Sequence, residues 1–429
     1  MKIGVIIGRF GDIDGVSLET QKWIDVLRNM GHEIFILTGR LVDNELNKDL
    51  HCTVLKPLSF FSPECEWEQK RAFYYPDDTS EQLIDHLNET AASLANDMFH
   101  WIVKNNLKFL ISENASALPC HLSMGMAIKK IAENTNLPII THDHDFYWER
   151  GDRYKTPFSD IGEIIKSTFP LHNDNVKHAV INTYSQTMLK DKLGVHSVVV
   201  PNVMDFSKNY GALDAYNKDF KSSFGWTDDD IILGQITRIV RRKGIETAIE
   251  LVARLDDPRV KLLITGSKAD DDRLGYYREL VELVEKNNLQ KQVQFGEYHI
   301  RHFRESGERI NTQKVYSLSD AYAHSTAATY FSTYEGFGNA FIECVLAKKP
   351  IFVNNYEPIY WSDIGSKGFE TVQIEDSNLT DDHVAAIRDI ITNPKRCKEI
   401  CEHNFELGKK HFSYEVLEEK LTELIEEFK

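Results

Sequence analysis

The stretch Glu335-Gly-Phe-Gly-Asn-Ala-Phe-Ile-Glu343 places two glutamates at the two ends of a glycine-bearing segment. Upstream, Ala328-Thr-Tyr-Phe-Ser-Thr333 is short, β-branched and aromatic, which predicts a buried strand. Downstream, residues 340–348 are good helix formers and stop before a proline. The pattern therefore predicts a strand-to-helix turn with Glu335 in the loop and Glu343 about one turn into the helix. Two carboxylates and a close backbone at such a turn suit the hydroxyls of a sugar nucleotide. The plainer alternative is a surface turn with two solvated acids.

The composition limits the classes of protein to consider. A chain of 429 residues with 42% hydrophobic residues is too long for one core and predicts about two domains. The net charge of -16 argues against nucleic acid or an anionic membrane as the main partner, so an anionic substrate would need a local basic pocket. The six cysteines show no metal-binding spacing, and no apolar run approaches ~18 residues. We therefore expect a cytoplasmic protein without integral membrane contact, and a homo-oligomer is compatible with the sequence.

The order of apolar segments predicts an α/β fold. Residues 3–8 form a continuous apolar run, which is typical of a strand buried on both faces of a parallel sheet. Helical and strand patterns alternate from there, although residues 41–78 lack a clear period, and the alternation begins again at residues 231–237. Two such halves predict two doubly wound, Rossmann-like domains over residues 1–205 and 206–410, with ligand at the carboxyl ends of strands. The amphipathic segment 411–429 predicts a helix that packs back on the first domain.

A basic cluster follows the predicted strand 231–237. The segment Arg238-Ile-Val-Arg-Arg-Lys-Gly244 gathers four cations at a strand's carboxyl end, in a chain that is otherwise acidic. Arginine can grip a phosphate with a fork of donors and lysine supplies a mobile point charge. The cluster indicates a phosphate site, and the alternative is a solvated basic turn.

A second polar cluster, Thr141-His-Asp-His-Asp-Phe-Tyr-Trp-Glu-Arg150, follows a strand of the first half. Alternating His and Asp suggests metal ligands, but neighbouring residues of an extended segment point in opposite directions. Since no further cluster is seen to supply ligands, we expect no metal site. A histidine that hydrogen-bonds a substrate hydroxyl is favoured over a histidine that only packs. Tyr147, Trp148 and Arg150 form either a wall for a sugar or anionic acceptor, or local packing.

These motifs resemble the retaining nucleotide-sugar glycosyltransferases of the GT-B fold, in the large family that includes sucrose-phosphate synthases and bacterial α-mannosyltransferases. The resemblance covers nearly the whole chain. It implies two Rossmann-like domains facing a central cleft, with the donor held by the second. By this resemblance, Arg238 and Lys243 hold the donor diphosphate, and Gly15 leaves room beside it. Glu343 binds the ribose and Glu335 binds hydroxyls of the donor sugar. His144 hydrogen-bonds the transferred sugar, and the amides of Phe337, Gly338 and Asn339 contact sugar and phosphate.

Two details depart from the family's pattern. Asp14 precedes Gly15 where the family often has a Gly-Gly pair, and His142-Asp143 repeats the His-Asp pair. The aromatic segment after the second pair favours His144, with Asp145, Tyr147 and Arg150 as acceptor-side residues. More narrowly, residues 14–20, 112–117 and 144–150 are similar to a subgroup that includes mannosylglucosylglycerate synthases, which make compatible solutes.

The predicted function is transfer of glucose or mannose from a UDP-, GDP- or ADP-hexose to a small polyol, sugar or glycerate derivative. No side chain is placed by sequence as a nucleophile, so the front-face mechanism of the resembled family, with retained configuration, fits better than a covalent intermediate. We expect no tightly bound cofactor and no metal, because fixed cations replace it; the triplets Asp228–Asp230 and Asp270–Asp272 are interpreted as solvated turns. The alternatives are a phosphorylase or epimerase of the same fold, and a sugar-nucleotide-binding protein without turnover.

Overall fold

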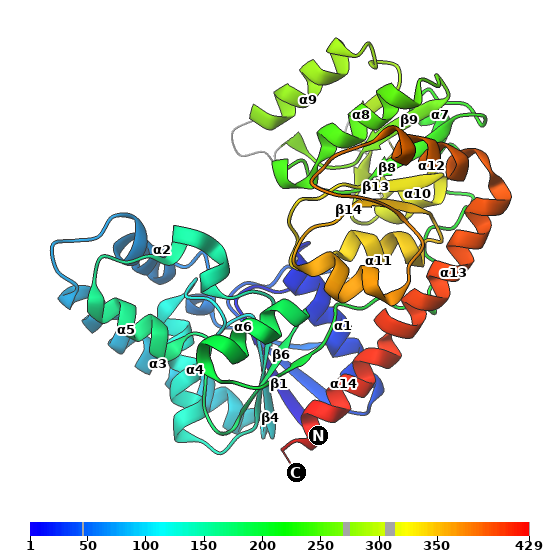
Figure 1. The fold of residues 1–429 in the computed structure, drawn as a ribbon. Coiled ribbons are helices and arrows are strands. Elements are labelled where there is room, and N and C mark those ends of the chain that lie inside the picture. Colours follow the sequence, from blue (N-terminus) through cyan, green and yellow to red (C-terminus); the bar gives the residue numbers. More distant parts are fainter. Residues whose placement is uncertain (45–46, 269–274, 305–313, 429) are drawn as a thin grey trace. The chain divides into compact units, whose positions relative to one another are not determined.

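The computed structural model describes residues 1–44, 47–268, 275–304 and 314–428 (Figure 1). Contacts within the chain divide it into two compact units: unit 1 is Met1–Val203 with Tyr414–Lys429, and unit 2 is Met204–Ser413. The boundaries expected at residues 205 and 410 lie close to these divisions. Each unit is built on a parallel β-sheet with helices on both faces, as expected of a Rossmann-like domain. The triplet Asp270–Asp272 lies outside the described residues.

Unit 1 contains a seven-stranded sheet in the order β3-β2-β1-β4-β5-β6-β7, and every pair of neighbours is parallel. Its strands are β1 (Lys2–Ile7), β2 (Glu33–Thr38), β3 (His51–Val54), β4 (Phe109–Glu113), β5 (Ile139–Asp143), β6 (Val176–Val180) and β7 (Ser197–Val199). The central strands β1, β4 and β5 are almost entirely buried, as their continuous apolar runs predict.

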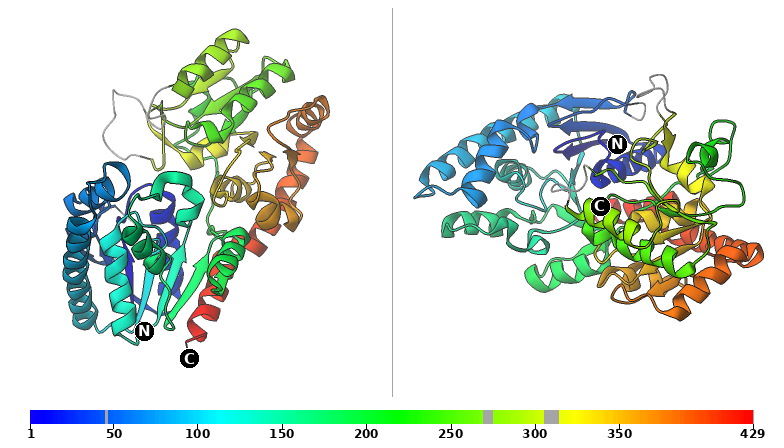
Figure 2. Two further views of the ribbon diagram at one scale, coloured as in Figure 1. Left: turned by 60° about the vertical axis from the view of Figure 1, so that its left-hand side comes forward. Right: turned by 90° about the horizontal axis from the view of Figure 1, so that it is seen from above.

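Helices cover both faces of this sheet (Figure 2). Because successive strand residues point to opposite faces, Ile3, Val5 and Ile7 of β1 join one core cluster and Ile6 joins another. The first cluster includes α1 (Gly15–Asn29) and α14 (Tyr414–Glu426), and the second includes α3 (Glu81–Asn105) and α4 (Leu122–Asn134). The remaining helices and turns are η1 (Lys56–Leu58), α2 (Pro63–Gln69), η2 (Lys70–Tyr74), η3 (Tyr147–Tyr154), α5 (Ser159–Thr168) and α6 (Thr183–Leu193).

Unit 2 contains a six-stranded parallel sheet in the order β10-β9-β8-β13-β14-β15. Its strands are β8 (Ile231–Gln235), β9 (Val260–Ile264), β10 (Val293–Phe295), β13 (Ala327–Tyr330), β14 (Ile351–Asn354) and β15 (Val372–Ile374). A separate parallel pair joins β11 (Ile300–Arg301) to β12 (Tyr316–Ser317). The helices and turns are α7 (Phe220–Ser223), η4 (Arg241–Lys243), α8 (Ile245–Leu255), α9 (Gly275–Lys286), α10 (Leu318–His324), α11 (Asn339–Leu346), η7 (Tyr360–Ile364), η8 (Gly365–Lys367), α12 (Asp381–Thr392) and α13 (Pro394–Phe412).

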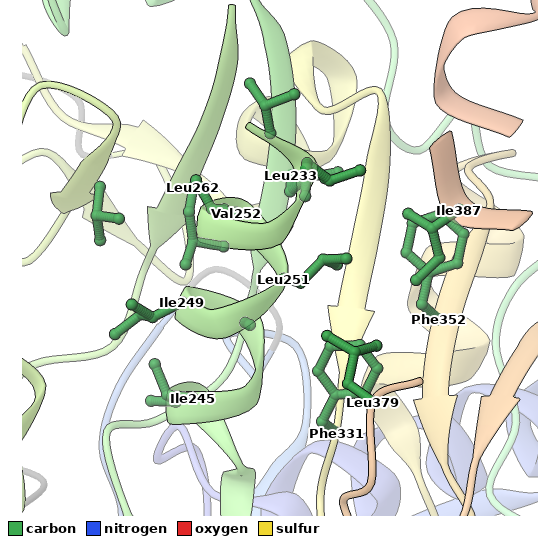
Figure 3. Packing of buried hydrophobic residues seen from close by; sticks show 14 of the residues in the cluster. Leu233, Ile245, Ile249, Leu251, Val252, Leu262, Phe331, Phe352, Leu379 and Ile387 are labelled. Carbon is green, nitrogen blue, oxygen red and sulfur yellow. The ribbon is translucent and has the colours of Figure 1, made fainter. Parts of the chain in front are cut away.

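One large apolar cluster fixes the sheet of unit 2 against α8, α9 and α12 (Figure 3). Leu233 and Leu262 from the strands meet Ile249 and Val252 of α8, and each of these side chains is fully buried. The cluster holds the strands rigidly, so the loops at their carboxyl ends start from fixed positions.

The C-terminal helix α14 completes the core of unit 1. Leu417, Leu421 and Leu424 are fully buried and pack in the same cluster as Trp23 and Ile24 of α1. The prediction that this helix packs back on the first domain is confirmed.

Removing one of these leucines tests the contribution of α14. We expect Leu421→Ala to lower the free energy of unfolding by about 2–5 kcal/mol, because it leaves a cavity in a closed core. Glu418→Ala on the exposed face of the same helix is the control, with a change within about 0.5 kcal/mol. Urea denaturation followed by circular dichroism measures both variants. Equal effects would show that α14 is not part of the core.

Candidate functional site

The loops that follow β8 and β13 carry the residues predicted to bind the donor. These strands are neighbours in the sheet, so the two loops leave from the same edge. Lys243 Nζ donates a hydrogen bond to Oε1 of Glu335, and Arg242 Nη1 donates to its Oε2 at 2.8 Å. The structure therefore brings together one glutamate and two cations that lie more than ninety residues away in the sequence.

This ion pair is buried. Lys243 is 9% exposed and Glu335 is 7% exposed. Burial raises the pKa of Glu335, but the charges of Lys243 and Arg242 outweigh it and hold that pKa below its usual value. Burial lowers the pKa of Lys243, while the Glu335 carboxylate opposes the change. The opposite charges are thus held next to each other in a nearly dry environment, where electrostatic interactions are strong.

Gly244 allows the two loops to pack closely. It adopts the left-handed conformation with φ of 58°, and a Cβ atom there would lie 2.1 Å from the carbonyl oxygen of Phe331. The backbone of the next loop is tied to the same turn, because the Thr333 amide donates to the Arg242 carbonyl at 2.8 Å. A glycine is therefore required for the fold at this position.

The four cations of the basic cluster have different partners and different exposure. Arg242 and Lys243 bind Glu335, whereas the exposed Arg241 forms an ion pair with Glu279 at 2.7 Å. Arg238 is exposed, and its side chain forms no ion pair within the part of the chain that the structure describes. Arg238 and Lys243 thus differ in their surroundings. The Arg238 side chain is open to solvent, whereas the Lys243 side chain is buried.

The segment from Glu335 to Glu343 forms a loop and the start of α11, as predicted, but β13 ends at Tyr330 rather than at Thr333. Phe337 is buried, with its carbonyl accepting a hydrogen bond from Tyr356 at 2.9 Å. After β13, the Ser332 carbonyl accepts from the Asn354 side chain at 3.0 Å and the Thr333 amide donates to the Arg242 carbonyl at 2.8 Å. These bonds replace the backbone pairing of the sheet, which explains the earlier end.

Two positions of this segment are set by the backbone and by α11. Gly338 has φ of 135°, and a Cβ atom there would lie 2.2 Å from the Tyr356 hydroxyl. Asn339 opens α11 and is half-buried. Glu343 is also half-buried on α11, near the buried Tyr322, whose pKa is raised first by burial and then by the Glu343 charge.

In unit 1, the carboxyl ends of β4 and β5 bring together Glu113, His142 and His144. His142 Nδ1 hydrogen-bonds with Glu113 Oε2 at 2.9 Å, and the two imidazole rings have centroids 4.4 Å apart. Trp23 stacks on the other side of the His142 ring with a centroid distance of 4.0 Å. One ligand-type atom from each of the three residues lies within 4.8 Å of the others.

The sequence showed no third cluster beside the two histidines, whereas the structure places Glu113 next to them. His142 and His144 are two residues apart on an extended segment, so they face the same side. Asp143 between them faces the opposite side, where its Oδ2 accepts from Thr141 at 2.7 Å and contacts His178 at 3.0 Å. Sequence reasoning missed Glu113, although its place at the end of a neighbouring strand was a usable signal.

The cluster is desolvated. Burial lowers the pKa of His142 to about 4 and that of His144 to about 3, so both imidazoles are neutral near pH 7. Burial raises the pKa of Glu113 to about 8, against the opposing influence of His144 and the Thr20 hydroxyl. At the edge of the cluster, Asn114 Oδ1 accepts a hydrogen bond from the His144 backbone amide at 3.2 Å and fixes the position of this backbone.

A cavity of about 590 Å³ opens beside this cluster within unit 1. Its walls combine aromatic rings with cationic and polar side chains. They are Ile7, Arg9, Asp14, Val16, Phe60, Phe61, Glu66, Gln69, Lys70, Tyr74, Tyr75, Glu113, Asn114, Leu118, Cys120, Arg153 and Tyr154. Gly15 lies between two lining residues, and a Cβ atom there would meet nothing within 4 Å. The packing of the fold therefore does not require glycine at position 15.

The acceptor-side residues predicted from the sequence lie near the cavity but do not line it. Asp145 forms an ion pair with Arg150 and accepts from Asn114 at 3.4 Å. Tyr147 is half-buried and packs edge-on against Trp148. The cations that line the cavity, Arg9, Lys70 and Arg153, were not singled out by sequence reasoning.

A second buried glutamate near the cavity has all its oxygen atoms in hydrogen bonds or ion pairs. Glu68 accepts from Ser123 and lies 3.3 Å from His121, whose other ring nitrogen lies 2.8 Å from the Pro57 carbonyl. Burial raises the pKa of Glu68, but hydrogen bonds from His121 and His86 outweigh it and lower the pKa to about 2.

Comparisons with known proteins agree with this architecture. Residues 217–406 match the family described as Glycosyl transferases group 1. The chain is 33% identical over 394 residues to the mannosylglucosylglycerate synthase of Petrotoga mobilis, covering 87% of this chain and 86% of that protein. It is 32% identical over 457 residues to that of Thermotoga maritima, covering 98% and 99%.

Two solved structures share the fold. The sucrose-phosphate synthase of Thermosynechococcus elongatus aligns with a TM-score of 0.66 at 15% identity, covering 99% of this chain and 98% of that chain. An Anabaena protein crystallised with UDP and glucose aligns with a TM-score of 0.63 at 14% identity, covering 100% of both.

The fold and these relatives define a glycosyltransferase of the GT-B class, which confirms the resemblance seen in the motifs. The chain belongs to the glycosyl transferases group 1 family. Among the helices of the described residues, none combines the length and apolar character needed to cross a membrane.

A substitution at Gly244 tests whether close packing of the two donor-side loops stabilises unit 2. We expect Gly244→Ala to destabilise the protein by about 2 kcal/mol more than Gly225→Ala. Both glycines have positive φ, but a Cβ atom at residue 225 meets nothing within 4 Å. Chemical denaturation measures the difference. Equal losses of stability in the two variants would mean that the left-handed backbone conformation alone, and not the contact with Phe331, causes the destabilisation.

The Glu68 cluster predicts a dependence of stability on pH. The folded pKa of about 2 lies below the ordinary value of 4.5, so the carboxylate stabilises the fold above pH 4.5 and loses that effect as the pH falls toward 2. We expect Glu68→Gln to cost up to about 3 kcal/mol at pH 7. The difference from the unsubstituted protein should shrink below about pH 5. Denaturation curves at several pH values would show this; a difference independent of pH would contradict it.

Proposed function

We propose that this protein transfers a hexose, mannose or glucose, from a nucleoside diphosphate sugar to a small hydroxylated acceptor that carries a carboxylate, with retention of the anomeric configuration. The observation that carries the proposal is the buried cluster of Lys243, Arg242 and Glu335 at the carboxyl ends of β8 and β13. Ligands of open α/β sheets bind at this edge.

The donor diphosphate would be bound by Lys243 and Arg238. Lys243 has three N–H donors and uses one on Glu335, so others are available to phosphate oxygens. Arg238 is exposed and follows β8 by a short segment, where its guanidinium can reach a phosphate with two donors. With fixed cations in these positions, the proposed donor site uses no divalent ion at the diphosphate and no tightly bound cofactor. The Anabaena structure that contains UDP and glucose supports a nucleotide-sugar donor.

Glu335 would orient the donor sugar. Its carboxylate is held by two cations, so it stays ionised and fixed while it accepts sugar hydroxyls. Glu343 would accept the ribose hydroxyls from α11, and the amides of Phe337, Gly338 and Asn339 would add contacts at the helix start.

The proposed reaction proceeds on one face of the sugar. The bond between the anomeric carbon and the leaving phosphate oxygen breaks as the acceptor oxygen bonds to the same face. The acceptor's proton passes to the leaving phosphate oxygen. Lys243 and Arg238 would stabilise the charge that develops on the diphosphate. The Nε2 atom of His144 is buried, which leaves Nδ1 as the ring nitrogen available to a hydroxyl of the transferred sugar.

The cavity of unit 1 would bind the acceptor. Arg9, Lys70 and Arg153 line it in a chain of net charge -16, and aromatic rings supply the flat apolar surface that sugar rings contact. Arg9 is partly neutralised by Asp14 at 3.2 Å, which makes Arg153 the best-placed cation for an acceptor carboxylate. A glycerate derivative has both groups that this cavity suits, and the two relatives named mannosylglucosylglycerate synthases support the same class of acceptor. By the same resemblance, Asp145, Tyr147 and Arg150 would support the acceptor from outside the cavity wall.

Two neighbouring cations of the basic turn separate the donor role from a general charge effect. We expect Lys243→Ala to lower product formation at least 100-fold, because the buried cation that faces the diphosphate is lost. Arg241→Ala should change it less than about 3-fold, since that side chain faces Glu279. Product is measured by mass spectrometry with GDP-mannose or UDP-glucose and glycerate derivatives. Equal effects of the two substitutions would contradict the donor assignment.

A thermal-shift screen identifies the donor nucleotide. UDP, GDP, ADP and their glucose or mannose conjugates are tested with and without EDTA. A ligand at a hundred times its dissociation constant stabilises the native state by roughly 2.7 kcal/mol, so the true donor should raise the melting temperature. The shift should survive EDTA and be lost in Lys243→Ala. The absence of a shift with every nucleotide would overturn the proposal.

A further inference from the structure

We propose that Glu113, His142 and His144 form a binding site for a divalent transition-metal ion of the zinc and cobalt class. The three residues come from two neighbouring strands of unit 1 and gather one ligand atom each within 4.8 Å of the others. The three ligand residues belong to unit 1, whereas the cations proposed for the donor diphosphate belong to unit 2. His144 is shared with the contact proposed for the transferred sugar.

The first argument is that the cluster has unused ligand atoms. Glu113 Oε1, His142 Nε2 and His144 Nε2 are buried, and none has a hydrogen-bond partner among the described residues. Buried polar atoms in native proteins are almost always satisfied, so three orphaned atoms in one place indicate a missing partner. An ion that accepts lone pairs from two imidazoles and a carboxylate is a partner that satisfies all three at once.

The second argument is the contrast with the other buried Glu-His-His group of unit 1. In the group of Glu68, His121 and His86, hydrogen bonds from Ser123 and to the Pro57 carbonyl use the polar atoms of the buried residues. The fold can therefore satisfy such a group with protein atoms. In the group of Glu113, His142 and His144, protein atoms among the described residues leave three buried polar atoms without a hydrogen bond, although both groups lie in unit 1.

The third argument is charge. The groups that face the cluster electrostatically are Glu19, Lys22 and Asp143. Glu19 pairs with Lys22, and Asp143 pairs with His178. Among the described residues, the ion pair of Glu113 is with His142, which carries a charge only when it is protonated. Because His142 is neutral near pH 7, the Glu113 carboxyl group has no cationic partner there among the described residues, and a dication would supply one.

The donor set selects the class of ion. Two imidazoles and one carboxylate suit zinc, cobalt or nickel better than magnesium or calcium, which prefer oxygen ligands. Zinc holds such ligands at about 2.0–2.2 Å, so the ligand atoms, which lie within 4.8 Å of one another, would move closer together to close on the ion.

Glu113 also lines the cavity of unit 1, and Asn114 next to it holds the His144 backbone. An ion bound by three protein ligands keeps further positions open. The open side of this site would therefore be available to an oxygen atom of whatever occupies the cavity.

The test uses the full chain with one metal at a time. The protein is stripped with a chelator and then equilibrated with Zn²⁺ alone or Co²⁺ alone. We expect one equivalent of metal per chain by mass spectrometry of the elements, visible d–d absorption of the cobalt form, and a higher melting temperature with zinc. Glu113→Gln and His144→Gln should each weaken binding at least 10-fold.

His86→Gln is the matched control, because it alters the satisfied Glu-His-His group at a half-exposed residue and should bind the metal as the unsubstituted protein does. Circular dichroism checks that every variant is folded. The proposal is overturned if the unsubstituted protein binds no zinc or cobalt above the buffer level. It is also overturned if Glu113→Gln and His144→Gln bind metal unchanged, which would place the ion elsewhere in the chain. None of these measurements depends on a nucleotide. Failure of the metal-site proposal therefore leaves the donor-site proposal standing, and failure of the donor-site proposal leaves the metal-site proposal standing.

Discussion

The parallel pairing of neighbouring strands is the constraint on which the rest of this structure depends. Parallel strands end at the same edge of a sheet, so residues far apart in the chain meet wherever two neighbouring strands stop. In unit 2 this brings Lys243 to Glu335, and in unit 1 it brings Glu113 to His142. Both meetings occur in surroundings without much water, which makes each charge costly unless it has a partner. The two buried charged clusters described above therefore lie at these two edges.

The two edges solve the problem of buried charge differently. At the end of β8 and β13, one carboxylate receives two cations, and the group is balanced by protein atoms alone. At the end of β4 and β5, one carboxyl group receives neutral imidazoles, and several of its polar atoms have no hydrogen-bond partner among the residues that the structure describes. A site of the first kind is ready for a ligand that competes for its cations. A site of the second kind is suited to a ligand that brings the cation itself.

Much of this could be predicted from the sequence, because the main signals are local. Apolar runs predicted the central strands, and the turn from Glu335 to Glu343 was placed correctly between a strand and a helix. The exposed edge strand β3 was missed, since its side chains are hardly buried and its sequence lacks an apolar run. Arg241 and Arg242 could not be told apart, because only the geometry of a short turn decides which of two adjacent side chains faces Glu335. Glu113 was missed because its partners come from a different strand.

The packing of α14 has a consequence for how the protein is made. Leu417, Leu421 and Leu424 belong to the core of unit 1, yet they follow the whole of unit 2 in the chain. Domains generally fold in the order in which the ribosome releases them. Unit 1 cannot follow that order to completion, since one wall of its core is synthesised only after unit 2. During synthesis the apolar surface of α1 that later receives α14 must remain uncovered, so unit 2 has the opportunity to be fully folded before unit 1 is.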